Sequence, residues 1–451
     1  MKFKMLKNRY LILFLSLAFL QAKAQVPSPA AKQQHSVLLF GATAHLGNGE
    51  VIPRSAIGFR DGKIDMVLAA LDARMDSTQY DTVIYLQGKQ LYPGFISPNS
   101  RLGLVEFDAV RATRDANDVG KLNPHIRAIP AYNTDSRIIP TVRSNGILTA
   151  QITPKGGRIS GSSSVVNLDA WNWEDALIKE GGGMHLNWPS VYLKRSWQDD
   201  KKRKKEEEYY QEELKQLRSY FEQALAYSKT DFVLEKNIRF EAMRSLFDKK
   251  AKLFVHAERV QEITDAIYFF DQFDLEVVIV GGSEAYLIAE LLKDRKIPIL
   301  LRRIHSLPLN QDDPIDLPYR LPKMLYDAGL LVGLQNSGSM ETMGTRNLPF
   351  YAGTAVAYGL DKEQALAMIT SNTAKILGVD NVLGTLAVGK YATLFISEGD
   401  ALDMRGNKIT MAFISGRKID LDDPHKALYR KFTKKYETEE NEKLNFLPNE
   451  K

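Results

Sequence analysis

Hydrophobic and polar positions change pattern twice along the chain. From Ser36 to Leu91, short apolar runs alternate with turn residues such as Asp61-Gly62, which is typical of β-hairpins. Between about 93 and 378, longer apolar runs alternate with helix-like segments. The hairpin pattern returns after Leu377, in GTLAVGKYATLFISEGD and NKITMAFISGRKI. We therefore expect two β-rich flanks to pair in space beside one region of mixed strands and helices.

The middle region predicts a parallel sheet covered by helices. Its strand-like runs are LFVHA (253–257), LEVVIVGG (275–282), IPILL (297–301) and GLLVGLQ (329–335). Strands that are apolar along their whole length are buried on both faces, as in sheets built from βα units. The pattern alone leaves open whether this sheet is open or closes into a barrel.

Residues 199–228 predict one long helix. A run of charged residues precedes apolar and aromatic side chains at helical spacing, namely Tyr210, Leu214, Leu217, Phe221 and Leu225. A solvated helix with a single apolar stripe explains this pattern, and a helix that binds a partner is the alternative.

A Gly/Ser segment contains Gly157, Gly161 and the serines at 160–164. It does not match a dinucleotide-binding fingerprint, which needs three glycines at fixed spacing. We interpret it as a βα loop, with binding of a polar ligand through backbone N–H groups as the alternative.

The N-terminus resembles a secretory signal peptide. A basic start is followed by the apolar run Leu11–Leu20 and the small-residue cleavage pattern Ala22-Lys23-Ala24. An apolar run of about ten residues is too short to span a bilayer. We expect the mature chain to begin near Gln25, to be exported to the periplasm or secreted, and to have no membrane attachment after cleavage.

Composition excludes several classes of function. Hydrophobic residues make up 44% and charged residues 25% of 451, as in ordinary globular proteins. Residues 1–24 hold five of the 60 basic residues and no acid, so the remaining 55 balance the 55 acidic residues. No net basic field remains to attract nucleic acid. The chain has no cysteine, which excludes disulfides, thiolate metal sites and cysteine nucleophiles.

Familiar catalytic motifs are absent, and two histidines stand out. The chain lacks the H-E-x-x-H, G-x-S-x-G and Walker patterns. His256 ends the apolar run LFV, and His305 follows ILLRRI, so both lie just beyond predicted strands. Barrel enzymes place their active sites at this end of their strands.

Several longer segments resemble the amidohydrolase superfamily, in particular its exported imidazolonepropionase-like members. The resemblance covers most of residues 38–420. The segments that carry it are TAHLGNGEVIPRSAIGFRDGKIDMV, GKQLYPGFISPNSRLGL, FVHAERVQEITDAI, NLPFYAGTAVAYGLDKEQALAMITSNTAKILGV and GTLAVGK.

The resemblance implies an α/β fold, a distorted (β/α)8 TIM barrel with a small β-sandwich domain formed by both terminal segments. It implies a hydrolase of non-peptide carbon–nitrogen bonds in small cyclic amides, with a divalent metal such as zinc activating water. We expect the following organisation: signal peptide 1–24, mobile leader 25–36, first half of the sandwich 37–92, barrel 93–378, second half 379–420 and a charged C-terminal segment 421–451.

The residues that the family uses as metal ligands are mostly replaced. Asn99 and Arg101 stand where the family has His-x-His, and Val280-Gly281-Gly282 stands where a sixth-strand histidine precedes glycine. Gln335-Asn336-Ser337 stands where the eighth strand presents aspartate. His256 is the only ligand-type residue that survives, and a catalytic zinc usually has three protein ligands. We therefore expect zinc not to bind.

We expect His256 and Asn336 as candidate catalytic residues. The candidate substrate-binding residues are Asn99, Arg101, His305, Arg303 and Arg346. We expect Arg101 to fill the vacated metal space, where it either binds a carboxylate or pairs with Glu106 or Asp108. A metal site rebuilt from other residues is the alternative, and it would use Glu106, Asp108, Asp135, His256 and His305.

Three functional hypotheses remain open at this point. The first is an exported amidohydrolase. The second is an inactive relative that binds a small-molecule ligand or supports an active paralogue in a hetero-oligomer. The third is metal-free chemistry, with His256 as the general base and Arg101 as the electrophile. A homo-oligomer is expected from the family.

Overall fold

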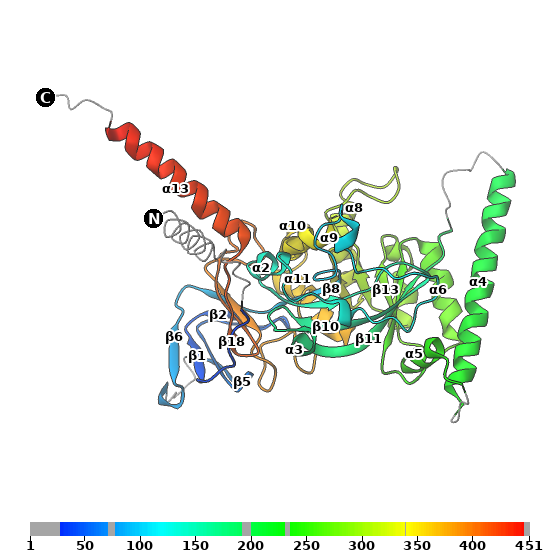
Figure 1. Cartoon of the computed structure of the whole chain (residues 1–451), viewed down its shortest axis with the longest axis horizontal. Coiled ribbons are helices and arrows are strands. Elements are labelled where there is room, and N and C mark those ends of the chain that lie inside the picture. The colour runs from blue at the N-terminus through cyan, green and yellow to red at the C-terminus, as the bar shows by residue number, and fades with distance from the viewer. Residues whose placement is uncertain (1–27, 71–76, 192–199, 231–234, 339, 446–451) are drawn as a thin grey trace, which may run out of the picture.

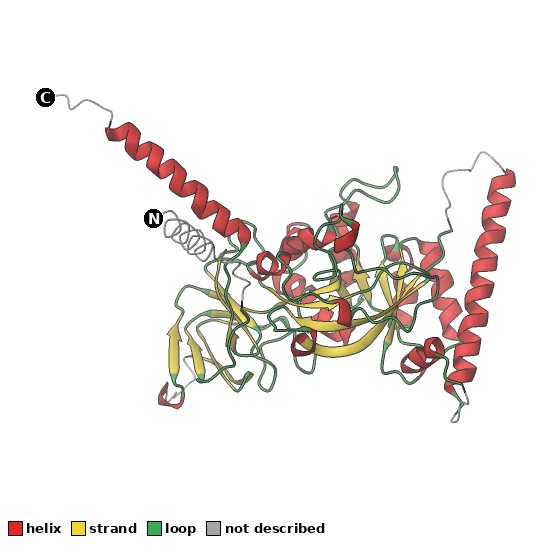
Figure 2. Ribbon diagram, viewed as in Figure 1, coloured by secondary structure: helices red, strands yellow, loops and turns green. Residues whose placement is uncertain are grey.

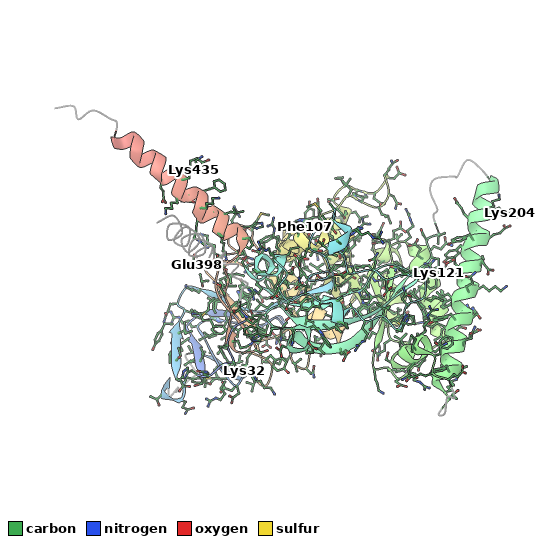
Figure 3. The ribbon with its side chains drawn as sticks, viewed as in Figure 1. Lys32, Phe107, Lys121, Lys204, Glu398 and Lys435 are labelled. Atoms are coloured by element: carbon green, nitrogen blue, oxygen red, sulfur yellow. The ribbon has the colours of Figure 1, made fainter. Side chains whose placement is uncertain are left out.

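The computed structural model describes residues 28–70, 77–191, 200–230, 235–338 and 340–445. An α/β barrel occupies the centre of the molecule, and a small β domain lies at one end of it (Figure 1). Helix α4 (Asp200–Ser228) stands at the opposite end, and helix α13 (Pro424–Asn445) projects from the body (Figure 2). Figure 3 places Lys204 on α4 and Lys435 on α13 at opposite sides of the molecule. The predicted signal peptide lies outside the described residues.

Eight strands form the barrel sheet, and they are neighbours in chain order. They are β8 (Phe95–Ser100), β9 (Ile147–Ile152), β10 (Ile159–Asn167), β11 (Leu177–Asn187), β12 (Lys252–Ala257), β13 (Val277–Gly281), β14 (Ile299–Leu301) and β15 (Val332–Leu334). The four apolar runs of the sequence correspond to β12 to β15, and their side chains are almost all buried. This confirms the predicted distorted barrel.

Strand β10 breaks the parallel pattern, because it pairs antiparallel with both β9 and β11. The interpretation of the Gly/Ser segment as a βα loop was therefore wrong, since Gly161 and Ser160–Ser164 belong to this strand. Ser163 and Ser164 are buried and use their hydroxyls inside the barrel. A strand that buries small polar residues lacks the apolar signal by which strands are recognised.

Helices pack around the barrel strands. They are α2 (Ile138–Arg143), α3 (Trp173–Ala176), α5 (Ile238–Phe247), α6 (Val260–Asp271), α7 (Ala289–Asp294), α8 (Leu317–Asp327), α9 (Glu341–Gly344), α10 (Leu348–Ala357), α11 (Lys362–Met368) and α12 (Ser371–Leu377). Within the described ranges, no helix has the length and apolar character needed to cross a membrane.

Helix α4 has the predicted apolar stripe. Tyr210, Leu217 and Phe221 are buried, and the rings of Phe221 and Phe270 of α6 lie 5.1 Å apart. On the same helix, Glu213 forms ion pairs with Lys121 at 2.5 Å and Arg158 at 2.7 Å. The stripe and these ion pairs hold α4 against the barrel.

The small domain is a sandwich of two sheets. The first contains β1 (Val37–Phe40), β4 (Ser55–Arg60), β5 (Lys63–Ala69) and β6 (Thr82–Tyr85). The second contains β2 (Thr43–His45), β3 (Val51–Ile52), β7 (Gln90–Pro93), β16 (Leu394–Ser397), β17 (Ile409–Ile414) and β18 (Arg417–Lys418). Strands β7 and β16 pair antiparallel, so the two ends of the chain build one domain, as predicted.

A buried ion cluster joins the two domains. Asp169, which lies between β10 and α3, pairs with Arg143 of α2 at 2.5 Å and with Arg417 of β18 at 3.0 Å. The same carboxylate accepts a hydrogen bond from the backbone N–H of Ala30. Residues of the barrel, of the small domain and of the segment predicted as a leader therefore meet at one aspartate.

Candidate functional site

The carboxyl ends of the barrel strands surround a cavity of about 720 Å³. This is the end at which barrel enzymes bind their substrates. Apolar walls come from Trp188, Val280 and Leu309. The polar side chains that matter most for its chemistry are Asn99, Arg101, Lys155, His256, Gln335 and Glu341.

Asn99 lies in the cavity lining and is held there by hydrogen bonds. Its φ angle of 49° lies in the left-handed region, which asparagine tolerates better than most residues. The backbone N–H of Asn99 donates to Oε1 of Gln151 at 2.9 Å, and its Nδ2 donates to Oε1 of Gln335 at 2.5 Å. This side-chain contact links β8 to the residue after β15, the first and last strands of the barrel sheet.

Lys155, which the sequence analysis did not identify, brings a positive charge to Asn99. It follows β9, and its Nζ donates to Oδ1 of Asn99 at 2.5 Å. Among the described residues, no carboxylate lies within 4.0 Å of this nitrogen. Burial lowers the pKa of Lys155 to about 8, opposed by Glu341 and assisted by Arg101. Lys155 is therefore a cation whose partner is a neutral amide.

Arg101 has the carboxylate partner that Lys155 lacks. Its Nε lies 2.7 Å from Oε1 of Glu341, and its terminal nitrogen lies 3.5 Å from Asp108. The sequence analysis named Asp108 and Glu106 as partners, but it did not identify Glu341. Glu341 comes from α9, which no local sequence pattern connects to β8.

Two histidines form a hydrogen-bonded pair at the cavity, with His185 buried and His256 in the cavity lining. Nδ1 of His185 lies 2.9 Å from Nε2 of His256, and Nε2 of His185 lies 2.9 Å from Oγ of Ser163. Burial lowers the pKa of both imidazoles well below the usual value, and the charge of Lys155 lowers both further. His185 is fully buried in β11, and no sequence pattern identified it as a candidate.

The eighth strand contributes Gln335 rather than Asn336 to the cavity wall. Asn336 is buried behind it and has both ends of its amide bonded. Nδ2 donates to the carbonyl of Glu341 at 2.5 Å, and Oδ1 accepts from the hydroxyl of Tyr351 at 2.6 Å. These bonds hold the segment that presents Glu341 to Arg101.

Three other candidate residues lie away from the cavity lining. Nε2 of His305 is bonded to the hydroxyl of Thr354 on α10 at 2.7 Å. Arg303 lines a smaller adjacent hollow. Arg346 lies 3.0 Å from Nδ1 of His425 at the start of α13. The structure thus brings Asn99, Arg101 and His256 together in the cavity lining. His305, Arg303 and Arg346 lie elsewhere.

The side chains in the cavity do not fit a divalent metal. Within the part of the chain that the structure describes, no group of three or more His, Cys, Asp or Glu residues is arranged to hold one. The amide oxygen of Asn99 faces the ammonium of Lys155, and Arg101 adds a second cation. Two cations at this place repel a metal ion.

The alternative set of metal ligands is not assembled either. Asp108 is engaged near Arg101, and Asp135 lines a separate hollow beside α2. His305 lies against α10, as described above.

Comparison with known proteins gives similarities over most of the chain. The model of the amidohydrolase family matches residues 321–419, a segment that includes Gln335 and Glu341. The amidohydrolase tasK of Hapsidospora irregularis is 21% identical over 397 residues, which is 80% of this chain. The chain spans only 39% of the length of that relative.

Solved structures share the fold. An amidohydrolase from Thermotoga maritima superposes with a TM-score of 0.72 at 23% identity, over 85% of this chain and 99% of that one. An adenosine deaminase from Xanthomonas campestris with bound zinc gives a TM-score of 0.52 at 15% identity, over 91% of this chain and 100% of the other.

Proposed function

We propose that the chain, which is similar to amidohydrolases in sequence and fold, keeps the barrel cavity but uses it to bind a small carboxylate without a divalent metal. The observation that carries the proposal is Lys155, a cation in the cavity wall whose side chain bonds only an amide among the described residues. A cation that is partly withdrawn from water is costly unless an anion compensates it, and Lys155 is half-buried in the cavity wall. A bound carboxylate would supply the missing negative charge.

The second cation supports the same class of ligand. Arg101 is already paired with Glu341, so it is held in place and contributes positive potential rather than a free binding group. Asn99 keeps Lys155 oriented toward the cavity through its amide oxygen. The cavity of about 720 Å³ has the size of a small-molecule site.

The same geometry argues against metal-assisted hydrolysis of cyclic amides, the activity that the family resemblance implies. That reaction needs a water activated by a metal and a group that accepts its proton. The residues after β15 are Gln335 and Asn336, and a carboxamide is not a base at neutral pH. The charges that are present suit an anion instead.

Metal content and anion binding can both be measured on the purified chain. The folded chain, purified without chelators, is expected to contain far less than one zinc, manganese, iron or nickel ion by mass spectrometry. Sodium formate is expected to raise the melting temperature above that in sodium chloride of equal ionic strength, because ligand binding stabilises the folded state. About one metal ion per chain, lost in His256→Ala, would support the hydrolase instead. A melting temperature that formate leaves unchanged would contradict carboxylate binding.

Carboxylate affinity is expected to fall as the pH rises above about 8, the pKa of Lys155 in the free chain. Below this pH Lys155 is already an ammonium. Above it, the amine must take up a proton when the anion binds, so each pH unit weakens binding about tenfold until the pKa of the complex is reached. Calorimetric titration with mandelate from pH 6.5 to 9.5, in two buffers of different ionisation enthalpy, measures both effects. An affinity that stays constant from pH 6.5 to 9.5, without proton uptake, would assign the binding to Arg101 or another arginine, because a guanidinium remains charged over this range.

A further inference from the structure

We infer that His256 presents an unprotonated Nδ1 to the cavity, so that the ligand is a carboxylate that also carries an N–H or O–H donor. This inference rests on the proposed carboxylate site at Lys155 and specifies the second half of the ligand. It follows from a series of hydrogen bonds that connects Asn99 to His256. In this series, the donor or acceptor role of each group determines where the next group carries its proton.

The series starts at a backbone group that can only donate. The N–H of Asn99 donates to Gln151 at 2.9 Å, so the accepting atom of Gln151 is its carbonyl oxygen. The other end of the same amide is therefore the NH₂ group. It lies 2.9 Å from Oγ of Ser163 and donates to it.

The hydrogen bonds of Ser163 determine which nitrogen of His185 carries the proton. The hydroxyl of Ser163 lies 3.1 Å from the carbonyl of Gly183, which can only accept, so the single proton of the hydroxyl points there. Ser163 must then accept from both of its other neighbours, Gln151 and Nε2 of His185. Nε2 of His185 consequently carries the proton.

His185 in turn fixes His256. A cationic His185 would add a second uncompensated charge beside Lys155, so the neutral form is present and its Nδ1 is a lone pair. This Nδ1 accepts from Nε2 of His256 at 2.9 Å, which leaves the proton of His256 on Nε2. Nδ1 of His256 is then an acceptor. No described residue bonds it, and it is not sealed from solvent, since His256 lines the cavity.

The cavity therefore combines a cation at Lys155 with a fixed acceptor at His256. Monocarboxylates with a hydroxyl or a secondary amide satisfy both groups. A dicarboxylate would place a second anion against the lone pair of His256, and a plain carboxylate would leave that lone pair without a partner. The ligand class is thus hydroxy acids and N-acyl amino acids rather than dicarboxylates.

The tautomer can be measured on the ligand-free chain by ¹⁵N–¹H correlation through the imidazole carbons, with His256 assigned by the signals lost in His256→Gln. The expected result is a protonated Nε2 and an unprotonated Nδ1. The opposite tautomer would overturn the inference without bearing on carboxylate binding, because no ligand is present. The wild-type spectrum gives the tautomer of each histidine, since the two tautomers differ in their coupling patterns, and His256→Asn provides a second assignment if His256→Gln is poorly folded.

Ligand preference provides the second test. Mandelate and 3-hydroxy-3-phenylpropionate are compared with their O-methyl ethers, which keep the carboxylate and the ring but lack the donor. The better-fitting hydroxy acid is expected to bind about tenfold more tightly than its ether, since the ether leaves the acceptor of His256 without a donor. The difference should shrink in His256→Phe. Equal affinities of acid and ether would overturn the inference while the formate effect stands, whereas loss of the formate effect would overturn the proposed function itself.

Discussion

Replacing Lys155 with methionine is expected to weaken mandelate binding by about thirtyfold or more at pH 7, because removing one partner of a charge pair that is withdrawn from water costs roughly 2–5 kcal/mol. Methionine has a similar length and keeps the apolar stem. It removes the only cavity cation that has no carboxylate within 4.0 Å among the residues shown to line it. Calorimetric titration of wild type and variant gives the two dissociation constants.

The matched control is Lys215→Met, which removes one lysine from an exposed position on α4. It changes the net charge by the same amount and is expected to leave affinity unchanged, since exposed charges far from a site are screened by salt. If both variants lose affinity equally, long-range charge explains the binding. If neither does, another group holds the carboxylate and the assignment of Lys155 is wrong.

Strands of the barrel could be predicted where burial and hydrophobicity coincide. Strands β12 to β15 are short apolar runs between helical segments, and the sequence therefore reveals them directly. Strand β10 could not be found in this way, because its buried positions are filled by serines that pair inside the barrel. Its antiparallel direction follows from a short connection, residues 153–158, which is too short for the crossover that a parallel pair needs.

The site could be predicted only in part, for a related reason. His256 lies in β12, which the apolar pattern reveals, and Asn99 and Arg101, at the end of β8, were identified through the family resemblance. All three line the cavity. Lys155 and His185 belong to the region around β10, whose strands carry no such signal. Glu341 reaches the site from α9 through a contact far away in the sequence. A polar network of this kind depends on tertiary pairing, which single-sequence patterns do not contain.

Replacing Asp169 with alanine is expected to lower the free energy of unfolding by about 3–5 kcal/mol, the usual cost of leaving buried charges unpaired. The side chain of Asp169 is 5% exposed, and those of Arg143 and Arg417 are 6% and 17% exposed. Alanine would leave two guanidinium groups without their carboxylate and Ala30 without its acceptor. Urea unfolding followed by both circular dichroism and tryptophan fluorescence measures the loss and tests whether the domains unfold together.

Asp403→Ala provides the comparison, because Asp403 also pairs with an arginine but that arginine, Arg405, is 92% exposed. Its loss is expected to cost less than about 1 kcal/mol, as exposed ion pairs do. If both variants lose an equally small free energy of unfolding, water must solvate the charges of Arg143 and Arg417 once the carboxylate is removed. A large loss confined to Asp169 would mean that the small domain, attached through β18, depends on a residue of the barrel for its stability. In that case the cavity and the sandwich cannot be separated into independently folding units, and truncated chains would not report on the carboxylate site.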